Sequence, residues 1–340
     1  MNHTSIDKSW THLIAADMPI DDFWEFATAL NRETGATFHT IWSDGRAQVP
    51  RIIRWARYIA MAVRLIRHRS HLQVVVCWQQ FFAVLYAFLC SLLRLAPTTQ
   101  VIALTVIIKP RAGFIGVIQR WVLRRALRSG HIRRAVVYNP AEIGAYSSWL
   151  NVDAGIFAHI PLALHHMPPK DLNIGDDGFY FATGKSNRDY SLLLHTLADT
   201  AHQVVIACDT LPQPAASNIT VVHDAFDDDM LRIMCRARAV IITLNDPYIS
   251  SGQLVALQAM ALKKPLIVTQ GDALSHYVTH GDNALVIEKT PYALINAVVN
   301  IDNNLDLRLR LSTNGHKRFQ QNHTLQAMAH NLREACGDLS

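Results

Sequence analysis

The 340 residues of this chain are 50% hydrophobic and 17% charged, which supplies apolar side chains for two packed cores and argues against a disordered chain. A formal net charge of +5 suits an anionic small molecule or a membrane surface. With no nucleic-acid-binding motif and no basic stripe interleaved with aromatic residues, the sequence argues against a dedicated nucleic-acid binder.

Apolar strand patterns alternate with helical patterns along the chain, which is typical of parallel sheets with crossover helices. We expect a first domain over 1–163, a linker over 164–178, a second domain over 179–320, and a helix over 321–340 that packs back on the first domain. The expected strands are 12–15, 37–42, 73–77, 100–105, 135–138, 154–160, 179–183, 204–208, 219–223, 239–244, 265–269 and 284–287. The predicted fold class is therefore α/β, with two Rossmann-like domains facing across a cleft that holds the ligand.

Two segments of the first domain are unusually basic. Residues 51–69 and 114–134 both read as helices in which arginines alternate with Trp, Ile, Leu and Val. This pattern favours a helix that lies in an anionic bilayer interface. The alternative is an amphipathic helix that packs on the sheet with its arginines toward solvent, and both can hold.

The second domain begins with FYFATGKSNRDYSLLLHTL, a strand followed by a loop and a helix. The loop carries Lys185 and Arg188, and two cations on such a loop suit a diphosphate. Alone, Arg188 and Asp189 could simply be a surface pair. Further on, Asp227, Asp228 and Asp229 resemble an acidic metal motif, but they precede a helical pattern and we interpret them as its cap and first turn.

A Ser/Gly loop joins the strand over 239–244 to a nearly all-apolar helix over 254–262. The free amides and dipole of a helix start favour phosphate, Ser250 and Ser251 suit the N-cap, and Gly252 permits close approach of a ligand. Gln258 lies on the same helix face as Ser251 and needs a hydrogen-bond partner in protein, water or ligand. The alternative is an ordinary capped helix.

Together, FATGKSNRDYSLLL, SSGQLVALQAMALKKPLIV and HGDNALVIEKTPYALINAV resemble the nucleotide-sugar-binding half of GT-B glycosyltransferases. The chain looks most like the large retaining family 4, or group 1, which includes bacterial exopolysaccharide and lipopolysaccharide enzymes. The resemblance covers about residues 178–320. In the first domain it is limited to the alternation of strands and helices and to Ile160-Pro161.

The resemblance implies roles for both loops. Lys185 and Arg188 would bind the donor diphosphate, and Gln258 would meet the nucleotide ribose. The other substrate-binding residues expected around these loops are Gly184, Tyr248, Ser250, Ser251, Gly252 and Gln253. The ring of Tyr248 would stack on the base, or else it packs against the end of the sheet.

The chain departs from the family at two positions. Where the family usually has two glutamates eight residues apart, this chain has Ser250 and Gln258. The amide of Gln258 still offers a donor and an acceptor to a ribose hydroxyl, but Ser250 supplies no carboxylate beside the reacting sugar. Retention and inversion of the anomeric centre therefore both stay open.

An inverting reaction would need a general base in the first domain. The loop after the first strand offers Asp17, Asp21 and Asp22, of which Asp21 and Asp22 are better placed to cap a helix over 23–30. We therefore expect Asp17 to be the base. The expected catalytic residues are Arg188, Lys185 and Asp17.

The predicted function is a metal-independent glycosyltransferase that uses a nucleotide diphosphate sugar and a lipid-linked glycan acceptor in bacterial surface or exopolysaccharide synthesis. No cofactor besides the donor is expected. The alternatives are a non-catalytic GT-B-like protein that binds a nucleotide sugar or a partner, and a nucleotide-sugar epimerase.

The expected location is the cytoplasm, peripheral at the inner face of the cell membrane. The five cysteines are odd in number and widely spaced, which indicates buried free thiols in a reducing compartment. The first residues show no secretory pattern. The longest apolar run, 81–93, falls short of the roughly twenty residues of a spanning helix, so we expect a core helix there.

Overall fold

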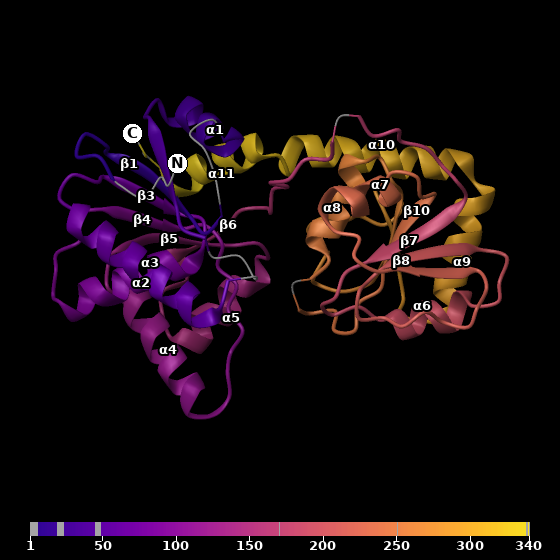
Figure 1. Cartoon of the computed structure of the whole chain (residues 1–340), viewed down its shortest axis with the longest axis horizontal. Helices are drawn as coiled ribbons and strands as arrows, with labels where there is room; N and C mark the ends of the chain where they lie inside the picture. Colours follow the sequence, from indigo (N-terminus) through magenta and orange to yellow (C-terminus); the bar gives the residue numbers. More distant parts are fainter. Residues whose placement is uncertain are drawn as a thin grey trace. The chain divides into compact units, whose positions relative to one another are not determined.

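The computed structural model describes residues 6–18, 24–44, 49–169, 171–249, 251–337 and 339. The chain divides into two compact units (Figure 1). The first unit comprises Met1–Pro161 and Leu325–Ser340, and the second comprises Leu162–Thr324. All five cysteines are buried free thiols. Across the described residues, no helix has both the length and the hydropathy that a membrane crossing requires.

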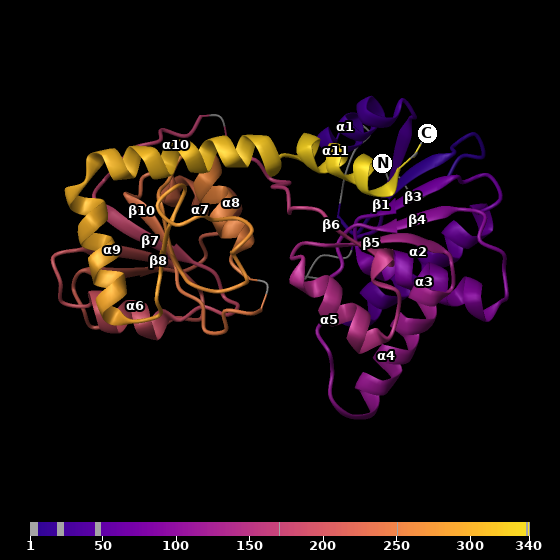
Figure 2. The same cartoon turned by 180° about the vertical axis from the view of Figure 1, so that it is seen from behind.

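Six parallel strands form the sheet of the first unit in the order β2-β1-β3-β4-β5-β6. They are β1 His12–Ala16, β2 Phe38–Trp42, β3 Val74–Cys77, β4 Gln100–Ala103, β5 Ile132–Val137 and β6 Phe157–His159. The helices are α1 Glu25–Thr34, α2 Arg51–His68, α3 Gln80–Leu92, α4 Gly113–Arg128, α5 Ala141–Leu150 and α11 Leu325–Cys336. Figures 1 and 2 show α1 and α11 on one face of the sheet and α2, α3 and α4 on the other. Because both faces are covered, every residue of β1 and β3 is buried.

The second unit has its own parallel sheet, in the order β12-β11-β10-β7-β8-β9. Its strands are β7 Phe179–Thr183, β8 Gln203–Ala207, β9 Ile219–Val222, β10 Ala239–Ile242, β11 Leu266–Thr269 and β12 Leu285–Ile287. Its helices are α6 Tyr190–Leu197, α7 Asp227–Met234, α8 Gln253–Ala261, α9 Pro291–Asn303 and α10 Leu305–Asn322. The apolar surface of α8 is buried because one side packs on β10 and β11 and another on α10.

The structure confirms the α/β class with Rossmann-like sheets, and all twelve expected strands are present. One expected element is wrong. The basic segment over 114–134 is not a single helix, because α4 ends at Arg128 and Gly130 adopts a φ of +77°, after which the chain forms β5. The run over 81–93 forms the core helix α3, as expected.

Candidate functional site

The strand order of the second sheet reverses between the neighbouring strands β7 and β10. Open α/β sheets bind ligands at the carboxyl ends of the strands beside such a reversal. The loops that follow β7 and β10 are tied together there. The side chain of Asn187 donates to the carbonyl of Asp246 at 2.8 Å and accepts from its amide at 2.8 Å. Two segments about sixty residues apart in sequence thus meet at one end of the sheet.

Arg188 links the two loops through its guanidinium group. Its Nε donates to the carbonyl of Thr183 at 2.9 Å, and its Nη1 donates to the carbonyl of Ser186 at 3.0 Å and to Oγ of Ser251 at 2.9 Å. Burial lowers the pKa of Arg188. The structure therefore brings two of the predicted site residues, Arg188 and Ser251, into direct contact.

Gly184 makes room for this guanidinium. Its φ is +118°, and a Cβ placed on it would lie 2.7 Å from Nη2 of Arg188. A side chain at this position would therefore meet both backbone strain and a steric clash. The hydroxyl of Tyr190 donates to the carbonyl of Gly184 at 2.7 Å, which fixes the same turn from the other side.

The second predicted cation, Lys185, lies in a different contact. Its ammonium forms an ion pair with Asp209 and lies 5.0 Å from the ring centroid of Phe226. The hydrogen bond from Lys185 lowers the pKa of Asp209. Sequence reasoning missed Asp209, which follows β8 and so lies at the same end of the sheet as Arg188.

Asp189 does not form a surface pair with Arg188. Its Oδ1 accepts from the amide of Leu192 at 3.0 Å and so caps α6, and its Oδ2 lies 2.8 Å from Nζ of Lys289. Lys289 also donates to the carbonyl of Asn245 at 3.0 Å. Through Asp189 and Lys289, the loop after β7 is thus also linked to the loop after β10. Sequence reasoning missed both the cap made by Asp189 and its pairing with Lys289, which lies 100 residues further along the chain.

The start of α8 differs from the expected serine cap. Gly252 is the N-cap, with a φ of +86°, and it makes no side-chain hydrogen bond because it has no side chain. Ser251 uses its hydroxyl on the first loop instead, donating to the carbonyl of Ser186 at 3.2 Å. Ser250 lies outside the described residues. The first amides of α8 have no intrahelical partner, and this helix follows β10, one of the two strands at the switch point.

Two glutamines of α8 are buried at 7% and 6% exposure, Gln253 and Gln258. The amide of Gln253 donates to the carbonyl of Ala273 at 3.1 Å, so its role is at least partly structural. Among the described residues, the side-chain amide of Gln258 has no hydrogen-bond partner. Tyr248 is 74% exposed, so its ring does not pack against the end of the sheet.

In the first unit, Asp17 directly follows β1, where the strand order reverses between β1 and β3. Its Oδ2 accepts from the hydroxyl of the buried Tyr58 at 3.3 Å. Burial raises the pKa of the Asp17 carboxyl, although the hydrogen bonds that it accepts and Arg54 act the other way. Asp21 and Asp22 lie outside the described residues.

The acidic run is part of a helix. Asp227, Asp228 and Asp229 form the first turn of α7, as expected, with Phe226 rather than an aspartate at the N-cap. His166 lies 2.8 Å from Asp228. Within the part of the chain that the structure describes, no group of three or more His, Cys, Asp or Glu side chains could hold a metal ion.

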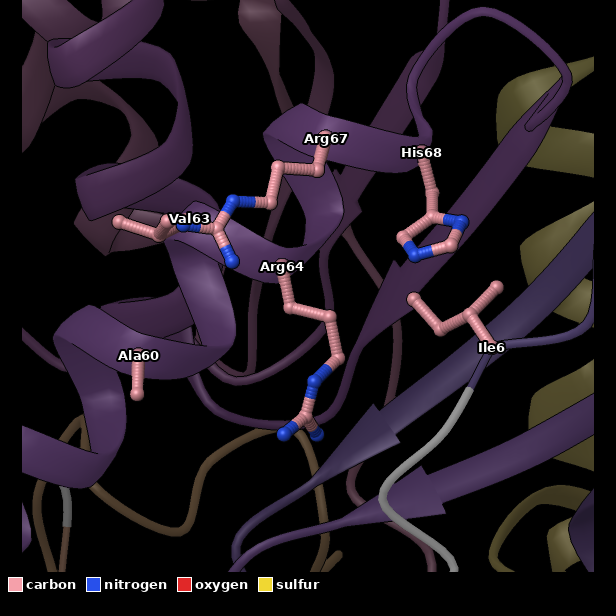
Figure 3. Close-up of a pocket in the computed structure, with 6 residues that line it drawn as sticks. All are labelled: Ile6, Ala60, Val63, Arg64, Arg67 and His68. Carbon is pink, nitrogen blue, oxygen red and sulfur yellow. The ribbon is translucent and has the colours of Figure 1, made fainter.

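A pocket of about 470 Å³ lies on α2 in the first unit. Figure 3 shows Arg64, Arg67 and His68 projecting from this helix, with Ile6 among the residues that complete the lining. Burial lowers the pKa of both Arg64 and His68. None of the predicted site residues lines this pocket, so it is separate from the site at β7 and β10.

Residues 190–304 match the family model described as Glycosyl transferases group 1, which confirms the resemblance seen in the sequence. None of the curated proteins matches the chain. One similar solved structure is HepE from Anabaena in complex with UDP and glucose, with 11% identity, a TM-score of 0.65, and coverage of 97% of this chain and 100% of that chain. Sucrose-phosphate synthase from Thermosynechococcus elongatus has 17% identity, a TM-score of 0.66, and coverage of 95% and 98%. WaaG, a glycosyltransferase involved in lipopolysaccharide biosynthesis, has 13% identity, a TM-score of 0.60, and coverage of 95% and 98%. These structures share the fold of the chain.

Proposed function

Because residues 190–304 match the group 1 glycosyl transferases and the chain has the GT-B fold, we propose that this protein transfers a sugar from a nucleotide diphosphate sugar to an acceptor hydroxyl. The observation that carries the proposal is the contact of Arg188 with Ser251, which joins the loops after β7 and β10 at the switch point. A donor diphosphate placed there meets a guanidinium and the free amides of α8 together.

The chemistry needs positive charge where the bond between the sugar and the diphosphate breaks. Negative charge grows on the leaving diphosphate, and a fixed cation stabilises the transition state more than the ground state. Arg188 is held in place by three hydrogen bonds, so it does not have to reorganise during the reaction. Lys185 would have to leave Asp209 to reach the diphosphate, so Arg188 is the principal cation in this proposal. Because Arg188 and the free amides of α8 supply positive charge at the diphosphate, the reaction proceeds without a divalent cation.

The nucleoside is assigned to α8 and the loop before it. The side-chain amide of the buried Gln258 offers a donor and an acceptor to a ribose hydroxyl. The exposed ring of Tyr248 supplies a face on which a base can stack. These contacts are the same before and during the reaction, so they contribute to donor affinity rather than to turnover.

The acceptor is assigned to the first unit, with Asp17 as the base that accepts the proton of its hydroxyl. Burial raises the pKa of this carboxyl, which makes it a stronger base than an aspartate in water. We propose a lipid-linked glycan acceptor at the cytoplasmic face of the membrane, because α2 and α4 carry exposed Ile52, Phe114 and Trp121 among arginines. Synthesis of a surface or exported polysaccharide is the process that uses such an acceptor.

Calorimetric unfolding with UDP, GDP and dTDP sugars in the presence of EDTA tests this function. UDP-glucose is the first donor to try, because the similar HepE structure holds UDP and glucose. A donor at a hundred times its Kd should add about 2.7 kcal/mol to the stability of the unit that binds it. Failure of every sugar nucleotide to stabilise the protein, with or without magnesium, would remove the proposal. Stabilisation without sugar transfer or donor hydrolysis in membrane extract would identify a non-catalytic binding protein.

A further inference from the structure

An apolar groove of about 560 Å³ lies in the first unit between α2, α3, α4 and the loop after β4. Its walls are formed chiefly by Trp55 of α2, Phe81, Leu85 and Phe88 of α3, and Ile115 and Ile118 of α4. This volume is within the range of roughly 300–1,000 Å³ that is typical of small-molecule sites. Figure 1 shows the three helices on one face of the sheet, so the groove belongs entirely to this unit.

The walls of the groove are held in place by hydrogen bonds to the loop after β4. Gln80 of α3 donates to the carbonyl of Ile107 at 2.7 Å, and Gln119 of α4 donates to the carbonyl of Lys109 at 3.1 Å. A Cβ on Gly116 would lie 1.9 Å from the carbonyl oxygen of Arg111, so a glycine is needed where the loop lies against α4. The groove is therefore preformed rather than a gap between loosely packed helices.

Apolar side chains at this groove stay exposed to solvent. Ile115 is 61% exposed, Ile118 is 46% exposed and Trp55 is 39% exposed. An exposed apolar groove of this kind marks a binding surface. Three cations, Arg51, Lys109 and Arg111, also line it, and no acidic residue is found among the described residues of its lining. A hydrocarbon chain that ends in a phosphate matches this combination of walls and charge.

The groove is connected to the candidate base. The ring of Phe81, which lines the groove, stacks on the ring of Tyr58 with 5.5 Å between centroids, and the hydroxyl of Tyr58 donates to Asp17 at 3.3 Å. Within the described part of the chain, the buried Nε of Arg54, whose charge lowers the pKa of Asp17, has no hydrogen-bond partner. Two side chains, those of Phe81 and Tyr58, therefore separate a ligand in the groove from the group assigned to acceptor activation.

We propose that this groove holds the hydrocarbon chain of the acceptor lipid, with the lipid phosphate at Arg51, Lys109 and Arg111. The role as acceptor rests on the proposed sugar transfer, whereas binding of the lipid chain does not. The proposal goes beyond contact with a membrane surface, because it requires one chain to leave the bilayer and enter the protein. A lipid of this class arises from a reaction that phosphorylates a long-chain alcohol or attaches a first phosphosugar to it.

The test uses the full-length protein and farnesyl phosphate that carries a photoreactive diazirine. Peptides from α3 and α4 should be labelled, and unlabelled farnesyl phosphate should compete while inorganic phosphate should not. Ile118→Asp and Ile115→Asp place a carboxylate in the groove and should lower labelling by about tenfold or more, because an unpaired charge in an apolar site is strongly unfavourable. Both side chains are well exposed, so the fold should survive the change.

Val117→Asp is the matched control, because Val117 is on the same helix and 65% exposed but does not line the groove. Its labelling should stay within about twofold of the wild type. Equal losses in Val117→Asp and Ile118→Asp would show a flat membrane-contacting face, and competition by inorganic phosphate would show a headgroup site alone. A dimer that Ile118→Asp dissociates would make a second copy the occupant. Each of these results would overturn the proposal. Stabilisation by UDP-glucose, measured on the same variants, reports the proposed donor function independently and should not change.

Discussion

The backbone of Gly184 lies directly against the guanidinium of Arg188. The guanidinium, the main cation of the site, can lie there only because residue 184 has no side chain. Gly184→Ala should therefore displace Arg188 and lower kcat/KM. A strained φ costs about 1–3 kcal/mol, which corresponds to roughly 5- to 160-fold if the loss appears in the barrier. Gly144→Ala is the control, because a Cβ there meets nothing within 4 Å and the residue lies inside α5. Steady-state kinetics with both variants tests this prediction, and equal activity of the two would contradict it.

Arg188 and Gln258 should respond differently to truncation. Arg188→Ala should lower kcat by a factor equivalent to about 2–4 kcal/mol, because its contact strengthens as charge grows on the leaving diphosphate. Gln258→Ala should raise KM and leave kcat nearly unchanged, because a ribose contact is equal in the ground and transition states. Initial rates over a range of donor concentration separate the two effects. An Arg188→Ala variant that only binds the donor more weakly would indicate a binding protein.

His323 should make the second unit sensitive to acid. It is 2% exposed, stacks on Tyr277 and has Nδ1 at 3.0 Å from the carbonyl of Leu162, and burial lowers its pKa to about 4. An unfolded histidine has a pKa near 6.5, so between about pH 6.5 and 4 the unfolded chain binds the extra proton. The contribution of His323 to the free energy of unfolding should therefore be complete above about pH 6.5. It should fall by up to about 3 kcal/mol as the pH falls to 4.

Urea unfolding followed by circular dichroism at pH 4.5 and 7.5 measures this effect. His323→Phe removes the titrating group, so the variant should lose that part of the pH dependence while the exposed control His195→Phe keeps it. The same slope in His323→Phe and in the wild type would mean that other groups cause the acid sensitivity.

At the scale of helices and strands, the sequence predicted the strands well because buried parallel strands are continuous apolar runs with clear boundaries. It predicted α4 less well. The pattern of arginines continues to Arg134, but Arg133 and Arg134 belong to β5 and donate to the carbonyls of Cys336 and Ala335. Those partners lie about two hundred residues away, so no local pattern could reveal them.

In the loops of the candidate site, too, local sequence patterns do not reveal contacts between distant residues. Arg188 and Ser251 each carried a local signal, a cation or a serine between a strand and a helix, and their contact is a consequence of the strand order. The pairing of Lys185 with Asp209 was not predictable, because it depends on the neighbouring position of β7 and β8. The N-cap at Gly252 was missed because Ser251 uses its hydroxyl in a long-range hydrogen bond.

The helix α4 yields a prediction about membranes. Reversal of charge at Arg120 and Arg124 to Glu should weaken binding to anionic vesicles by at least about tenfold, because each basic residue near such a surface is worth about 1 kcal/mol. Lys263→Glu with Lys317→Glu makes the same change in net charge in the second unit and should have little effect. Flotation with anionic and neutral vesicles is the measurement. Equal flotation of the wild type with both vesicle types would refute membrane attachment through charge.

At the scale of the whole molecule, the two units carry different spectroscopic reporters. All seven tryptophans lie in the first unit, namely Trp10, Trp24, Trp42, Trp55, Trp78, Trp121 and Trp149. Met328 in the first unit and Met260 in the second are both 1% exposed, so each change to Ala should cost about 2–5 kcal/mol. Met328→Ala should shift the thermal transition seen by tryptophan fluorescence, whereas Met260→Ala should shift only the remaining transition seen by circular dichroism. Identical shifts in both signals would show that the units unfold as one cooperative system.

The place of α11 on α1 also sets an order of events during translation. Because α11 packs against α1 but follows the whole second unit in sequence, the ribosome completes the second unit before the last helix of the first unit exists (Figure 2). Domains usually fold in the order in which they are synthesised. In this chain, synthesis of the first unit begins first but is completed last. The apolar side chains of α1 therefore lack their partner helix while the second unit leaves the ribosome. The surface of α1 that α11 covers in the finished protein therefore stays open on the nascent first unit until the second unit has been synthesised.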